Sequence, residues 1–194
     1  MLCTGDTMSD FLKQIKEDIL EYQSKYPHCQ NMKKDEWAFN FWVLDKLYKE
    51  DEQVIEDKIV DYNDKGIDCF VWHEDTLDLY LIQNKFYAEG TNLTNEYVQN
   101  DFLTRAIGAL EKGTYTRSSE LQEIYTKHSS KSEFTVHFVL YVTNTTAKTK
   151  SIVDGLKKFN ESHQRQEAVI YDLNDIESLY YDKPIVKRKK CHLK

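Results

Sequence analysis

An acid, an amide and an amine in the middle of the chain are spaced so that they could meet at one end of a β-sheet. Asp68 opens one apolar, β-prone run, and Gln83 and Lys85 close the next run. Side chains two apart on a strand share a face, so Gln83 and Lys85 point the same way. Carboxylate and amide oxygens suit a hard cation such as Mg²⁺, and an ammonium group can stabilise developing negative charge. The three side chains could therefore support metal-assisted hydrolysis.

The two apolar runs flank a short polar segment, which predicts a β-hairpin. A two-residue turn at 74–75 would pair Asp68 with Leu81 and leave Asp68 diagonal to Gln83 on one face of the ribbon. A turn one residue longer, without a bulge, would move Asp68 to the other face. On that shared face we expect an apolar stripe that ends at the polar groups: Phe70, Trp72, Leu77, Leu79 and Leu81.

This hairpin resembles the signature of the PD-(D/E)xK nuclease superfamily, in its Gln-x-Lys branch. The resemblance is carried by Asn-Asp-Lys-Gly-Ile-Asp at 63–68 and Ile-Gln-Asn-Lys-Phe at 82–86. The chain is similar to Mrr-type restriction endonucleases and closer to the N-terminal nuclease-like region of abortive phage infection resistance (AIPR) proteins. The similarity spans roughly residues 33–180.

The resemblance implies an α/β fold with a restriction-endonuclease-like core, in which helices flank a mixed central β-sheet that includes the hairpin. It implies a metal-dependent endonuclease that hydrolyses phosphodiester bonds of DNA, acting in anti-phage defence. Asp68, Gln83 and the backbone carbonyl of Asn84 would bind Mg²⁺ or Mn²⁺, and Lys85 would orient or deprotonate the attacking water.

One further acid is expected, because Gln83 contributes no charge. Glu36 matches the helix glutamate that many members of the superfamily carry, and we take it as the fourth catalytic residue. Asp61 and Asp64 lie just upstream of the hairpin, where AIPR-like sequences also have acids, and Asp61 is the reserve choice.

Each of these residues also has a structural explanation. Asp68 could cap the turn after Gly66, Gln83 could be a satisfied polar group in a central strand, and Lys85 could lie at an exposed strand end. Glu36 could simply favour the N-terminal end of a helix dipole. Two other functions therefore remain open: a nuclease fold without turnover that recognises nucleic acid or protein, and an unrelated α/β interaction protein.

The rest of the pattern alternates helices and strands, which predicts a mixed sheet with helices on both faces. Residues 52–60 fit either a last helical turn or a short first strand. The expected helices are 9–26, 33–49, 94–112, 117–128, 147–160 and 174–181, and the expected strands beyond the hairpin are 134–143 and 167–172.

We expect an N-terminal helical extension over 1–32, a nuclease-like core over 33–182 and a basic tail or linker over 183–194. AIPR proteins are usually much longer, which suggests that a C-terminal domain could be missing.

Composition limits the protein class. The chain has 194 residues and is 40% hydrophobic, enough for one globular core. Its formal net charge of -7 means that DNA binding would depend on a metal, a local basic patch or another domain. Without a signal peptide pattern or a membrane-length apolar stretch, we expect a cytoplasmic protein with no membrane partner. Nucleases of this fold often pair, so a homodimer is a further expectation.

Overall fold

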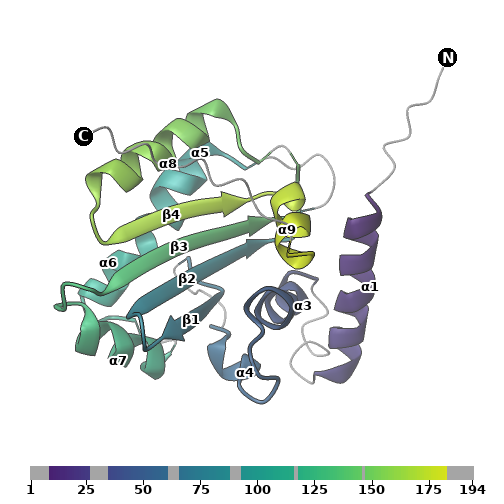
Figure 1. The fold of residues 1–194 in the computed structure, drawn as a ribbon, viewed down its shortest axis with the longest axis horizontal. Coiled ribbons are helices and arrows are strands. Elements are labelled where there is room, and N and C mark those ends of the chain that lie inside the picture. The colour runs from purple at the N-terminus through teal and green to yellow at the C-terminus, as the bar shows by residue number, and fades with distance from the viewer. Residues whose placement is uncertain are drawn as a thin grey trace.

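The structure, a computed structural model, describes residues 9–26, 35–60, 66–87, 93–115, 118–145 and 147–182. Its centre is a four-stranded sheet in the order β1-β2-β3-β4 (Figure 1). β1 is antiparallel to β2, and β2, β3 and β4 run parallel. The strands are β1 (Cys69–His73), β2 (Asp78–Lys85), β3 (Thr135–Val142) and β4 (Gln166–Tyr171). The mixed sheet expected from the sequence is therefore confirmed.

Helices cover both faces of this sheet. One layer consists of α1 (Asp10–Lys25), α3 (Asp35–Trp42), the π-helix η1 (Val43–Tyr48) and α9 (Leu173–Tyr180). The other contains α5 (Asn95–Tyr97), the π-helix η2 (Val98–Phe102), α6 (Arg105–Glu111), α7 (Ser119–His128) and α8 (Lys150–Ser162). A short helix, α4 (Ile55–Lys58), lies beside β1. Across the described ranges, every helix is too short or too polar to traverse a lipid bilayer.

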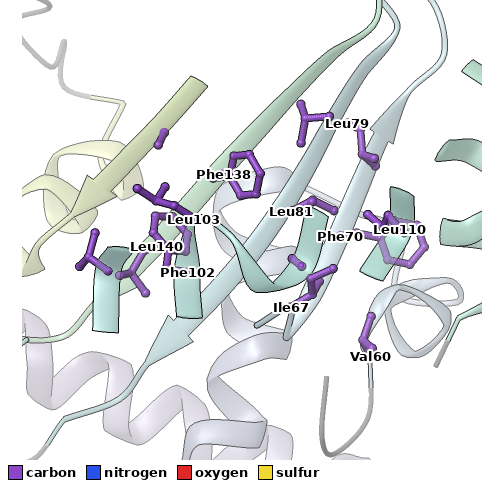
Figure 2. Packing of buried hydrophobic residues seen from close by; sticks show 14 of the residues in the cluster. Val60, Ile67, Phe70, Leu79, Leu81, Phe102, Leu103, Leu110, Phe138 and Leu140 are labelled. Carbon is purple, nitrogen blue, oxygen red and sulfur yellow. The ribbon is translucent and has the colours of Figure 1, made fainter. Parts of the chain in front are cut away.

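Each face of the sheet has its own apolar cluster, because successive strand residues point to opposite faces. Figure 2 shows one cluster, in which Phe70 of β1 and Leu79 and Leu81 of β2 pack with residues of η2 and α6. The other cluster holds Cys69 and Ile82, beneath the aromatic side chains of α1 and α3. β2 is consequently buried on both faces near its C-terminal end, and groups there are shielded from water.

The hairpin differs from the sequence prediction in its turn. The turn covers four residues, 74–77, so His73 pairs with Asp78 and Phe70 with Leu81. The predicted pairing of Asp68 with Leu81 is wrong by two residues. A shift of two residues keeps every side chain on its original face. The predicted apolar stripe therefore still lies on the same face as Asp68. Leu77 is the exception, since it lies in the turn with a left-handed φ of 57° rather than in the strand.

Two predicted helices change character along their length. The helix expected over 94–112 is divided into α5, η2 and α6, and the one over 33–49 becomes the π-helix η1 at Val43. In the ambiguous segment 52–60, α4 forms, and Ile59 then makes a single antiparallel bridge to Cys69. The short first strand is thus reduced to one bridge. The remaining helices and strands match their predicted ranges to within a few residues.

The outer edge of β4 is covered at its middle by a side chain. The Asn160 carboxamide on α8 accepts a hydrogen bond from the Ala168 N–H at 2.7 Å and donates one to the Ala168 carbonyl at 3.0 Å. One side chain therefore satisfies both backbone groups that a neighbouring strand would otherwise bind.

Candidate functional site

Asp68 lies at the point where β1 begins, level with the end of β2. Its backbone N–H donates to the carbonyl of Ile82 at 2.8 Å, which ties the residue to β2. Its carboxylate oxygen Oδ2 accepts the backbone N–H of Asn84 at 2.6 Å. A short hydrogen bond to a charged acceptor is among the stronger ones in proteins. The Asp68 carboxylate is therefore held beside the peptide that joins Gln83 to Asn84.

Gln83 is buried at this end of β2, with 5% of its surface exposed. Its Oε1 atom has no hydrogen-bond partner among the described residues. Burying an acceptor without a partner costs about 1–3 kcal/mol. This oxygen is therefore the feature of the site that most clearly calls for a ligand.

Gly66 provides the space next to that oxygen. A Cβ atom on Gly66 would lie 3.8 Å from Gln83 Oε1 and 2.9 Å from the backbone carbonyl oxygen of Asp101 in η2. The second distance is shorter than real Cβ contacts, and the φ of Gly66 is +89°, a conformation that favours glycine. The chain can pass between β2 and η2 here only because residue 66 has no side chain.

Lys85 points to the same side of the sheet as Gln83. Its Nζ lies 5.1 Å from the centroid of the Tyr97 ring on α5, a cation–π contact. No ion pair joins this ammonium group to a carboxylate within the described ranges. The positive charge at the end of β2 is thus positioned by an aromatic face and is not neutralised by a described acid.

Asn84 points to the opposite face, where it is buried with 4% exposure. Its Nδ2 donates to Oδ1 of Asn40 on α3 at 2.8 Å and approaches the Sγ of Cys69 at 3.7 Å. Burial and the neighbouring Asp68 carboxylate raise the pKa of the Cys69 thiol, so this cysteine stays protonated. Cys69 is thus a free, buried thiol within an apolar cluster.

Glu36 stands at the same end of the sheet but on the other side of it. It is exposed in the first turn of α3, which packs on the face opposite Gln83 and Lys85. Burial raises the pKa of Tyr87, which follows β2, and the Glu36 carboxylate raises it further. The reserve acids Asp61 and Asp64, and the basic tail 183–194, lie outside the described residues.

The donor set fits a hard cation in type. Asp68 offers carboxylate oxygen, Gln83 offers an amide oxygen without a partner among the described residues, and Asn84 offers a backbone carbonyl at the same strand end. All are oxygen ligands, the kind that Mg²⁺ and Mn²⁺ prefer. Within the described ranges, however, no group of three or more His, Cys, Asp or Glu residues could hold a metal ion. The site is therefore poorer in charge than a carboxylate cage.

Sequence reasoning missed three contributors to this site: Asn40, Tyr97 and the Asp101 carbonyl. Asn40 had a detectable signal, because it is the one polar residue in the run Trp-Ala-Phe-Asn-Phe-Trp at 37–42. An amide inside an aromatic run needs a buried partner. Neither Tyr97 nor Asp101 had a detectable signal in the sequence, since their positions depend on how α5 and η2 pack across the sheet.

Comparisons with known proteins assign no function to this site. The chain matches no protein-family model, and neither curated proteins nor solved structures show significant similarity to it.

Proposed function

We propose that this chain is a metal-dependent endonuclease domain that hydrolyses phosphodiester bonds of DNA in the cytoplasm, in anti-phage defence. One observation supports the proposal above the others. The Asn84 peptide holds the Asp68 carboxylate at the end of β2, and the buried oxygen of Gln83, the preceding residue of β2, has no partner among the described residues. The resemblance of this hairpin to PD-(D/E)xK nucleases supplies the reaction class.

In this proposal each residue has a distinct role. Asp68 and Gln83 hold the ion through carboxylate and amide oxygens, with the Asn84 carbonyl as a further ligand. When bound, Mg²⁺ or Mn²⁺ supplies positive charge that stabilises the negative charge of the transition state. Lys85, held against the Tyr97 ring, orients the attacking water. Glu36, exposed on α3 across the sheet from Gln83 and Lys85, is the helper acid that the resemblance implies.

The test is cleavage of supercoiled plasmid DNA in a series of divalent ions that includes Mg²⁺ and Mn²⁺. We expect Asp68→Ala and Lys85→Ala each to lower the cleavage rate by at least about 10²-fold, because each removes a group that acts in the transition state. Lys157→Ala is the control, since Lys157 is an exposed lysine on α8. If wild type and both site variants are equally inactive in every ion, the catalytic proposal is wrong.

A second candidate is a nuclease fold without turnover that recognises nucleic acid or protein. It is favoured by the neutral Gln83 and by the lack, among the described residues, of three or more His, Cys, Asp or Glu residues grouped to hold a metal ion. Its mark would be DNA retention that persists in Asp68→Ala and in the presence of a chelator. A steep fall of DNA affinity with salt would then indicate contacts to phosphates.

A further inference from the structure

We propose that Asn40 is a positioning residue: its side chain fixes Asn84, and the Asn84 peptide in turn holds the Asp68 carboxylate. That Asp68 serves a metal site rests on the proposed function, whereas the positioning of Asp68 by Asn40 can be measured without a metal.

The first step is the burial of the Asn40–Asn84 pair. Asn40 and Asn84 are 5% and 4% exposed, and the hydrogen bond between them is 2.8 Å long. Phe39 and Phe41, on either side of Asn40, are completely buried. Inside such an apolar cluster a lost partner leaves an unsatisfied amide, which costs about 1–3 kcal/mol. Asn84 Oδ1 has no partner among the described residues, so the Asn84 side chain is held through its Nδ2, by Asn40 and Cys69.

The second step runs through the Asn84 residue itself. Its side chain is anchored on the α3 side of the sheet, and its backbone N–H donates to Asp68 Oδ2 at 2.6 Å. Rotation of the Asn84 peptide would stretch both bonds together. The orientation of the N–H that holds the Asp68 carboxylate is thus coupled to a side chain on α3.

The third step concerns α3. Residues four apart on a helix lie on the same side, so Glu36 stands one turn before Asn40 on the side that meets the end of β2. The Asn40–Asn84 bond therefore also fixes how far Glu36 extends along the end of the sheet.

A purely structural role of Asn40 would give the same contacts in the wild type as a positioning role. The test therefore compares matched variants. Asn40→Leu removes the acceptor at similar volume, and Asn40→Asp keeps an acceptor oxygen in the same place. Asn160→Leu is the control, because it removes two hydrogen bonds to Ala168 on the edge strand β4. Two quantities are measured in each: hydrogen exchange of the Asn84 backbone amide, relative to amides of β3, and Mn²⁺ affinity by titration.

We expect Asn40→Leu to speed Asn84 amide exchange about 10-fold relative to β3 and to weaken Mn²⁺ binding about 10–100-fold, the usual cost of losing a residue that orients a ligand. Asn40→Asp should keep both the Asn84 amide exchange rate and the Mn²⁺ affinity close to their wild-type values. Asn160→Leu should change neither quantity. Unchanged Asn84 exchange in Asn40→Leu overturns the inference. Failure of the wild type to bind Mn²⁺ counts instead against the proposed function, and the exchange measurement still decides the role of Asn40.

Discussion

Among single residues, Gly66 shows how tightly the site is built. It combines a left-handed backbone with a neighbouring carbonyl that leaves no space for a Cβ atom. These two constraints are separable, because the chain holds other glycines that meet one of them or neither. Gly113 has a φ of +62° with nothing within 4 Å of the position that a Cβ atom would take, and Gly108 lies within α6 with open space around it.

We therefore expect a graded series of alanine variants. Gly66→Ala should lower the free energy of unfolding by about 2–4 kcal/mol, from backbone strain plus the clash with Asp101. Gly113→Ala should lower the free energy of unfolding by about 1 kcal/mol, from backbone strain alone. Gly108→Ala should gain about 0.5–1 kcal/mol, because alanine favours a helix over glycine. Urea unfolding measures all three, and equal values for Gly66→Ala and Gly113→Ala would show that the Asp101 contact is unimportant.

Among the elements, the hairpin turn carries the clearest strain. Leu77 is a branched apolar residue at φ 57°, and its carbonyl accepts a hydrogen bond from the Thr135 N–H at 3.1 Å. For such a residue the left-handed conformation costs about 1 kcal/mol. The carbonyl contact ties the turn to the start of β3, so the turn keeps this conformation despite the cost.

Leu77→Asn should relieve the strain, because asparagine tolerates this backbone conformation better. We expect the free energy of unfolding to rise by about 0.5–1 kcal/mol. The proposed DNA cleavage should not change, since the turn lies at the opposite end of β2 from Gln83 and Lys85. Thermal unfolding of Leu77→Asn and Leu77→Ala separates this effect from the simple loss of an apolar side chain. A gain in Leu77→Ala equal to that in Leu77→Asn would contradict the explanation.

The same turn explains what the sequence could and could not predict. Alternation of apolar residues placed Gln83 and Lys85 on one face, because that property depends only on the two-residue period of a strand. The register depended on turn length, and no Asn-Gly or similar signal marked residues 74–77. Asp68 lies on the predicted face of the hairpin only because the turn is longer than predicted by an even number of residues.

The π-helices η1 and η2 show a second limit of the sequence. Their apolar spacing is typical of an ordinary helix, and the extra residue in each turn is set by packing against the sheet. As a result, the position of the Asp101 carbonyl beside Gly66 could not be derived from periodicity. The contact between Lys85 and Tyr97 was hidden because it depends on how α5 packs across the sheet.

At the scale of the whole molecule, acid stability should depend on a pair remote from the candidate site. His137 Nε2 lies 2.8 Å from Asp78 Oδ1, at the N-terminal end of β2 and β3. Burial opposes ionisation of Asp78, but hydrogen bonds from Thr76 and His137 outweigh it and hold the pKa of this carboxyl below its usual value. A carboxyl with a lowered pKa stabilises the fold above its unfolded pKa of about 3.9 and loses that contribution as pH falls through the folded pKa.

Asp78→Asn should therefore lower the free energy of unfolding at neutral pH and make it less sensitive to acid below about pH 4. Urea unfolding at a series of pH values measures this, with Asp154→Asn as the control because Asp154 is exposed on α8. The prediction is wrong if wild type and Asp78→Asn lose stability in parallel as the pH falls.

The contact of the Asn160 carboxamide on α8 with β4 has a consequence for self-association. It occupies the N–H and carbonyl of Ala168, so an incoming strand would have to break two existing bonds before making its own at that position. Continuous sheets that extend from one molecule into the next are therefore disfavoured along this margin. If two copies act together on a duplex, we expect them not to join their backbones along β4.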